Sequence, residues 1–156
     1  MNKQKDIKHI WTVIAESSVV DRQTNNVSIH KIIEQLNVNV SSQDQELLNN
    51  NPDKALLVNF PFQVISMWQS TNPKKDPKAE ASIELFDPIG QSLQSAKFNL
   101  VFEKNKPRLR TIISSPNIRV FDSGVYLFKV RIKEEGAKDF LEVAELPLEV
   151  RVTKAK

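Results

Sequence analysis

Cysteine is absent from this chain of 156 residues, glycine occurs only three times, and long apolar runs are missing. Without cysteine there is no disulfide, no thiolate nucleophile and no cysteine-ligated zinc or iron–sulfur site. Three glycines are too few for the glycine-rich loops that hold phosphates and dinucleotides. The short apolar runs predict no membrane span. We therefore expect a cytoplasmic protein, in a reducing compartment, without a bound cofactor.

The chain also lacks a large excess of charge of one sign. The chain has 22 Lys and Arg against 19 Asp and Glu, a formal charge of +3. The first 78 residues hold 9 basic and 8 acidic side chains, and the remainder hold 13 and 11. Neither half is a basic arm of the kind that grips nucleic acid. With 40% hydrophobic and 26% charged residues, the composition is that of a globular chain.

Alternation of apolar and polar residues is the strongest pattern that is present. It has a period of two in Phe98–Glu103, Tyr126–Lys133 and Leu146–Val152, which predicts half-buried strands. The further strand candidates are His9–Ala15, Val27–Leu36, Val58–Gln69, Ala81–Phe86 and Arg108–Ile113. About eight short strands at this spacing predict an all-β, antiparallel two-sheet sandwich, Ig-like or C2-like.

The length predicts a single domain over residues 1–156. Three stretches, 1–7, 41–54 and 71–79, have the composition of loops. The second of these has room for at most one helical turn, around Asp44–Leu48. Val27–Leu36 mixes the strand and helix periods, and we interpret it as one strand with a bulge or a late turn.

Asp122, Gly124 and Tyr126 open the strand with the clearest alternation. Their arrangement is similar to the tyrosine corner of immunoglobulin-like sandwiches, in which the tyrosine hydroxyl binds back to the backbone. Phe128 stands where an antibody domain has a cysteine, which disfavours the extracellular, disulfide-bearing branch. The role that this resemblance implies is structural.

A wider pattern of turn and core residues resembles a family of small, uncharacterised bacterial β-sandwich proteins. The residues that carry it are Val20–Ile29, Phe60-Pro61-Phe62 leading to Trp68, Asp87-Pro88-Ile89-Gly90, Gly124–Phe128 and Leu146–Val150. The resemblance spans most of the chain. It implies a cytoplasmic bacterial protein and no established activity.

Phe60, Pro61 and Phe62 are the strongest candidates for a functional surface. A proline within an apolar strand predicts an edge or a bulge, and an apolar edge binds the strand of a partner. We therefore expect a non-enzymatic interaction or scaffold protein that pairs through Val58–Val64. Its partner is another protein or, most simply, a second copy of the chain.

A second hypothesis is a protein that binds nucleic acid or phosphate. The candidate residues are Lys104, Lys106, Arg108, Arg110 and Arg131. They form one basic face only if their two strands are neighbours. No aromatic residues lie between them to stack on bases, and Glu145 and Glu149 would offset the charge of the second strand.

A third hypothesis is a carbohydrate-binding module that stacks sugars on Trp11 or Trp68. Scattered aromatic residues are more often part of a core, and we expect that here. Isolated aspartates at Asp21, Asp87 and Asp122 predict turns rather than a calcium site.

Candidates for catalysis are weak. His9 and His30 have no acidic or histidine neighbour at ligand spacing, so they predict no metal site. Ser123 and the pair Ser114-Ser115 lack the glycines of a nucleophile elbow. The sequence therefore predicts no enzyme.

Overall fold

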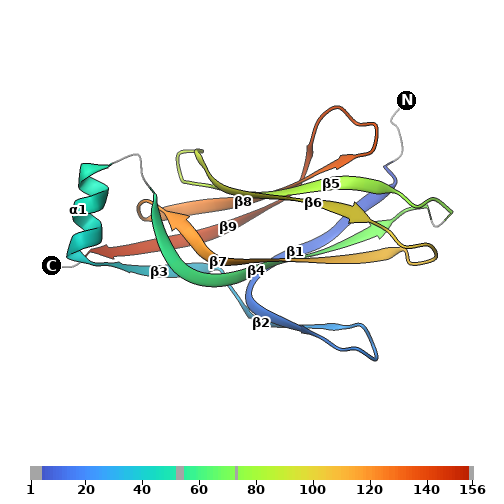
Figure 1. The fold of residues 1–156 in the computed structure, drawn as a ribbon, viewed down its shortest axis with the longest axis horizontal. Helices are drawn as coiled ribbons and strands as arrows, with labels where there is room; N and C mark the ends of the chain where they lie inside the picture. The colour runs from blue at the N-terminus through green and yellow to red at the C-terminus, as the bar shows by residue number, and fades with distance from the viewer. Residues whose placement is uncertain (1–4, 52–54, 73, 155–156) are drawn as a thin grey trace.

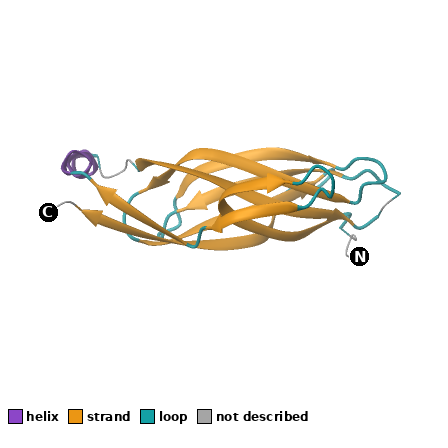
Figure 2. Cartoon of the chain, turned by 90° about the horizontal axis from the view of Figure 1, so that it is seen from below, coloured by secondary structure: helices purple, strands orange, loops and turns teal. Residues whose placement is uncertain are grey.

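Two β-sheets packed face to face make up the chain, with one short helix at the end of the long axis (Figures 1 and 2). The computed structural model describes residues 5–51, 55–72 and 74–154. The four-stranded sheet has the order β2-β1-β4-β7 and consists of β1 (Ile7–Val20), β2 (Val27–Ile32), β4 (Leu56–Ser70) and β7 (Arg108–Val120). The five-stranded sheet has the order β3-β9-β8-β5-β6 and consists of β3 (Gln35–Val40), β5 (Lys78–Phe86), β6 (Ser92–Val101), β8 (Gly124–Glu134) and β9 (Leu141–Lys154). The prediction of an all-β sandwich is confirmed.

One strand pairing differs from the antiparallel prediction. β3 runs parallel to β9, with Leu36 beside Val150 and Val38 beside Val152. The predicted single strand Val27–Leu36 is in fact two strands, because the chain crosses from one sheet to the other at Ile33 and Glu34. This crossing explains the mixed periodicity: alternation shows which face of a strand is buried, but not the sheet or the direction.

The loop-like segments are more ordered than predicted. Ser42–Asn50 forms α1, which is longer than one turn. Ser41 caps it by accepting a hydrogen bond from the Asp44 amide at 3.2 Å. The predicted loop 71–79 ends early, because β5 already begins at Lys78. Of the predicted loose start 1–7, residues 1–4 lie outside the described residues, as do 52–54 of the second loop.

The core lies between the sheets and follows the predicted alternation. On β8 the inward residues Tyr126, Phe128, Val130 and Ile132 are all buried. Burial of each large apolar side chain contributes roughly 1.5–3 kcal/mol to the free energy of unfolding. No helix in the described part of the chain is both long and apolar enough to cross a membrane.

The hydroxyl of Tyr126 binds the backbone at the corner before its strand. It accepts hydrogen bonds from the amides of Phe121 at 2.9 Å and Asp122 at 3.2 Å, and it donates one to the Asp122 carbonyl at 2.8 Å. Burial raises the pKa of Tyr126, so the hydroxyl keeps its proton. This is the geometry that the tyrosine-corner pattern predicts.

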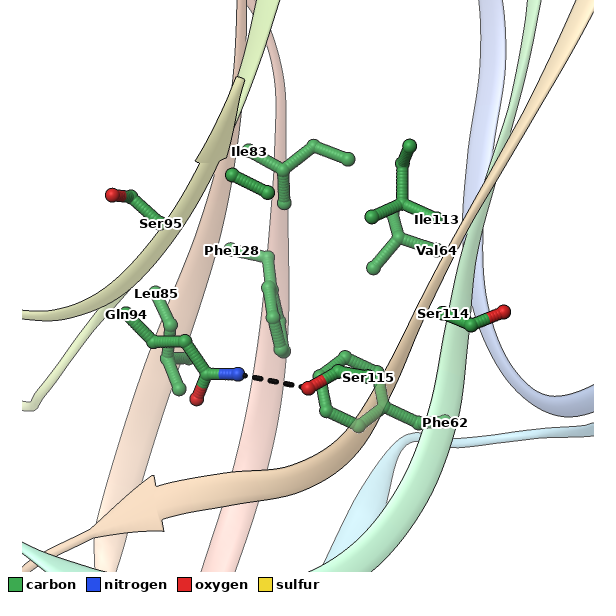
Figure 3. Close-up of a pocket in the computed structure, with 11 residues that line it drawn as sticks. Phe62, Val64, Ile83, Leu85, Gln94, Ser95, Ile113, Ser114, Ser115 and Phe128 are labelled. Carbon is green, nitrogen blue, oxygen red and sulfur yellow. Dashed lines mark hydrogen bonds between the residues drawn. The ribbon is translucent and has the colours of Figure 1, made fainter. Parts of the chain in front are cut away.

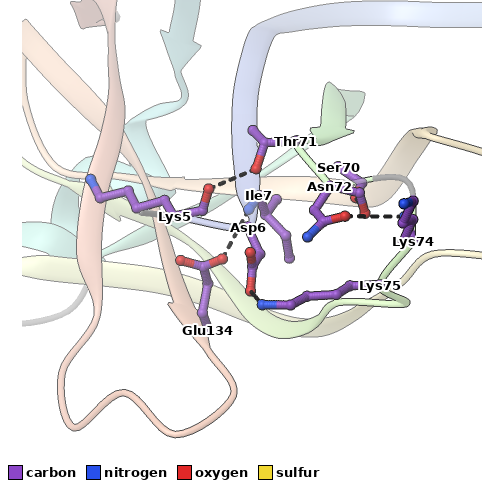
Figure 4. A network of polar contacts seen from close by, with 9 residues as sticks. All are labelled: Lys5, Asp6, Ile7, Ser70, Thr71, Asn72, Lys74, Lys75 and Glu134. Carbon is purple, nitrogen blue, oxygen red and sulfur yellow. Dashed lines mark hydrogen bonds and ion pairs between the residues drawn. The ribbon is translucent and has the colours of Figure 1, made fainter. Parts of the chain in front are cut away.

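A polar network joins the two sheets where β1 begins (Figure 4). The carboxylate of Glu134, at the end of β8, accepts a hydrogen bond from the Ile7 amide at 2.9 Å. The Thr71 amide donates to the Asp6 carbonyl at 2.8 Å, and the Asp6 carboxylate pairs with Lys75 at 3.4 Å. The start of β1 is therefore tied to both sheets.

Candidate functional site

β4 has a pairing partner on both sides for only part of its length. Over Gln63–Gln69 it lies between β1 and β7, so the predicted edge Val58–Val64 is wrong for its last two residues. The pairing with β1 ends at Ala15 opposite Gln63, where β1 turns away and continues as a hairpin with β2 (Figure 1). Over Leu56–Phe62, the registers of the described residues pair β4 with β7 alone. We call Leu56–Phe62 the open β4 edge.

The predicted residues Phe60, Pro61 and Phe62 lie at the inner end of the open β4 edge. The register with β7 shifts between Asn59 and Phe62, so Phe60 and Pro61 form a β-bulge. Pro61 is exposed and Phe60 is half-buried. The bulge is one of the two alternatives that a proline within an apolar strand predicts.

Phe62 belongs to the core and not to the accessible edge. Its side chain is 4% exposed and packs edge-on against Phe128, with ring centroids 5.8 Å apart. The accessible apolar side chain is instead Leu57, which is 54% exposed. Sequence reasoning missed it, although the alternation places odd-numbered residues of this strand on the outer face.

The predicted basic residues do not lie on neighbouring strands. Arg108 and Arg110 are on β7 of the four-stranded sheet, and Arg131 is on β8 of the five-stranded sheet. Lys104 and Lys106 lie in the turn before β7, where Lys106 forms an ion pair with Glu103. The condition on which a single basic face depended is therefore not met.

Arg110 and Arg131 each have a structural partner. The Arg110 guanidinium donates a hydrogen bond of 2.6 Å to the carbonyl of Asn25, at the tip of the β1–β2 hairpin. Arg131 pairs with Glu84 at 3.4 Å and lies 5.5 Å from the ring centroid of Phe86. Glu84 offsets the charge of Arg131, whereas the hydrogen bond to a neutral carbonyl orients the Arg110 guanidinium without neutralising it.

Other cations of the five-stranded sheet are also paired with glutamates, one across the β8–β9 hairpin and one within β9. Lys129 lies 3.9 Å from Glu145, and Arg151 lies 3.0 Å from Glu149. The neutralisation of this face by glutamates was predicted from the β8–β9 hairpin. Exposed pairs of this kind contribute at most about 1 kcal/mol each, so they shape the charge of the surface more than its stability.

The tryptophans do not form a stacking platform. Trp68 is 0% exposed, and its indole N–H donates to Thr111 Oγ1 at 3.1 Å. The carbohydrate-binding hypothesis is therefore wrong for Trp68, because no sugar reaches a fully buried ring. Trp11 is half-buried on β1.

The aspartates hold turns together. Asp87, which is 5% exposed, accepts hydrogen bonds from the amides of Ile89 and Gln91 at 3.1 and 2.7 Å. Asp87 and Asp122 both line a surface hollow between the β5–β6 and β7–β8 turns. Asp21 lies at the β1–β2 turn, where hydrogen bonds from the backbone amides of Thr24 and Gln23 lower its pKa.

The two histidines are separate from each other. His9 Nε2 lies 2.7 Å from Thr12 Oγ1, which in turn lies 2.8 Å from Ser66 Oγ. Burial lowers the pKa of His9, which favours the neutral imidazole. His30 is exposed on β2. Among the described residues, no three histidine or carboxylate side chains gather closely enough to hold a metal ion.

Comparison with known proteins gives the fold class. No family model matches the chain, and no curated protein matches its sequence. The chain is similar to the solved C-terminal domain of wzt, with 13% identity and a TM-score of 0.53 over 98% of this chain and 77% of that one. It also aligns with the PmoD soluble domain from Methylocystis sp. ATCC 49242 (Rockwell), with 12% identity and a TM-score of 0.29 over 96% and 94% of the two chains. The first similarity shows the fold, an all-β sandwich, and the second is too low to carry an argument.

Proposed function

We propose that the chain is a non-enzymatic protein-interaction module that binds through the open β4 edge. The observation that carries the proposal is the departure of β1 from β4 after the pair Ala15–Gln63. Beyond that pair, the side of Leu56–Phe62 that faces away from β7 has no strand partner among the described residues. Unpaired backbone N–H and C=O groups at a strand edge bind an extended segment of another chain.

The side chains of the open β4 edge suit an apolar partner strand. None of its seven residues is charged. Leu57 is 54% exposed, and Val58 and Phe60 are half-buried. Association through this edge therefore depends on main-chain hydrogen bonds and apolar contact, and it changes little with salt. Pro61 has no N–H and lies in the bulge, which limits the length of the ladder that a partner can add.

A second copy of the chain is the simplest partner. An uncharged segment meets its own copy without repulsion between like charges. Antiparallel pairing of two such edges around a two-fold axis is self-complementary, because each contact between residue i of one copy and residue j of the other is repeated between j and i. The resulting dimer would join two four-stranded sheets side by side.

The test compares two variants with matched exposure. Leu57→Lys places a charge on the open β4 edge, and Val101→Lys places one on β6, where Val101 is 55% exposed. We expect the wild type and Val101→Lys to form dimers as concentration rises, at low and at high salt, and Leu57→Lys to remain monomeric. Light scattering after size exclusion measures this. Dimers of all three proteins, or of none, would overturn self-association.

Purification of the tagged protein from its native cytoplasm, with and without nuclease, tests the remaining alternatives. A nuclease-insensitive protein that is lost from Leu57→Lys and kept by Val101→Lys supports the module with a different partner. Nucleic acid that elutes with salt overturns it. A cytoplasmic location and membership of the small bacterial β-sandwich family are part of this proposal. The lack of cysteine and the turn and core residues support them.

A further inference from the structure

A cavity opens into the sandwich on the side opposite the open β4 edge (Figure 3). It has a volume of about 140 Å³ and is lined by residues of both sheets. Its inner wall consists of buried side chains: Phe62, Val64, Ile83, Leu85 and Phe128. Of the described residues, none with a charged side chain lines it.

The cavity exists because one inward position of β6 is occupied by a small residue. Ala96 pairs with Ile83 of β5, at the centre of the cavity wall. Further along β6, Phe98 and Leu100 point inward and fill the same layer of the core. The side chain of Ala96 ends short of the opposite sheet and leaves the space unfilled.

The mouth of the cavity lies between two sheet edges that are not joined by a backbone ladder. β6 and β7 are edge strands of different sheets, and among the described residues no register pairs them. The side chain of Gln94 bridges them. The Gln94 amide donates to Ser115 Oγ and to the Asn117 carbonyl, both at 3.2 Å, and its oxygen accepts from the Arg119 amide at 3.2 Å. Among the described residues no backbone ladder closes this side of the sandwich, so a ligand can reach the cavity here.

From this geometry we propose that the cavity binds a small apolar molecule, such as a short alkyl chain or a benzene-sized ring, with a neutral polar end at the mouth. A dry apolar cavity of about 150 Å³ binds benzene in another protein, so the volume here suits the same class of ligand. At the mouth, the amide of Gln94 and the hydroxyl of Ser115 offer polar atoms to a polar end, whereas the hydroxyl groups of Ser95 and Ser114 point away from the cavity (Figure 3). A charged head group has no counter-charge among the lining residues. The cavity shares Phe62 with the open β4 edge, but the Phe62 side chain is buried in the core and does not belong to the accessible surface of that edge.

Two probe alcohols of equal length test the site. We expect 1-pentanol to shift the methyl resonances of Val64, Ile83 and Ile113, and to raise the melting temperature as it saturates. The control is 1,5-pentanediol, which would bury its second hydroxyl against the apolar inner wall and bind at least about tenfold more weakly. Equal effects of the two alcohols, or no shift of these methyls up to the solubility of 1-pentanol, would overturn the proposal.

Two variants then locate the binding. Ala96→Leu fills the cavity and should abolish the methyl shifts, whereas Ala137→Leu adds the same group at an exposed turn residue and should leave them unchanged. If Ala96→Leu does not fold, Gln94→Ala serves instead, because removing the bridge between β6 and β7 should speed exchange of the alcohol. Binding that is unaltered in either of these cavity variants would contradict the assignment.

Discussion

The variant Phe62→Ala tests whether Phe62 belongs to the core, as the structure shows, or to the partner-binding edge that the sequence predicts. Phe62 is 4% exposed and its ring contacts Phe128 edge-on. Truncation of a buried phenylalanine lowers the free energy of unfolding by about 3–5 kcal/mol. The site adjoins a cavity of about 140 Å³, so the vacated space merges with an existing void and the neighbours cannot close it. We therefore expect the upper part of that range.

Urea denaturation followed by tryptophan fluorescence measures this loss. For a chain of this size, each kcal/mol lowers the melting temperature by roughly 2–4 °C. Leu57→Ala is the matched control: Leu57 lies on the same strand but is 54% exposed, so we expect a loss below about 1 kcal/mol. A small loss for Phe62→Ala, or equal losses for the two variants, would refute the assignment of Phe62 to the core.

Three further predictions concern the turns and the buried polar groups. In Gly124→Ala the new Cβ would lie 2.5 Å from Pro88 Cγ, so we expect a loss of about 1–3 kcal/mol; the double variant with Pro88→Ala should recover part of it in a double-mutant cycle. Tyr126→Phe leaves the backbone groups of its corner unpaired and should lower the free energy of unfolding by about 1–3 kcal/mol, measured by thermal unfolding. An unchanged melting temperature would show that the corner is dispensable. Burial lowers the pKa of His9 below its ordinary value of 6.5, so the unfolded chain binds the proton more readily; the stability that His9 contributes is complete above pH 6.5 and is lost as the pH falls through the lowered pKa. Urea titrations from about pH 8 to pH 5 should show a shallower decline for His9→Gln, and identical declines would contradict this reasoning.

Local alternation was sufficient to predict the faces of the strands. Tyr126, Phe128, Val130 and Ile132 point inward as predicted, because a strand buries every second residue. Alternation does not carry the direction of the neighbouring strand, so the parallel pairing of β3 with β9 was missed. The length of the polar helix α1 was underestimated, since the helix buries no residue and so has no apolar periodicity.

The sequence predicted only part of the candidate site, because the rest depends on pairing between residues that are distant in the sequence. Pro61 signalled an irregular strand, and the bulge is there. Whether that strand is an edge depends on where β1 leaves β4, which is decided by residues distant in the sequence, at Ala15. Likewise, the basic face required β7 and β8 to be neighbours, and strand order across two sheets is not encoded in the spacing of Arg110 and Arg131.

Hydrogen exchange at Leu56–Phe62 tests the central claim most directly. The peptide that covers this segment is followed in dilute and in concentrated protein, with the β6 peptide around Val101 as an internal reference. If the open β4 edge pairs with a second copy, its amides that face away from β7 become protected as dimers form, and the reference peptide does not change. Dimers whose Leu56–Phe62 amides exchange as fast as those of the monomer would contradict the account.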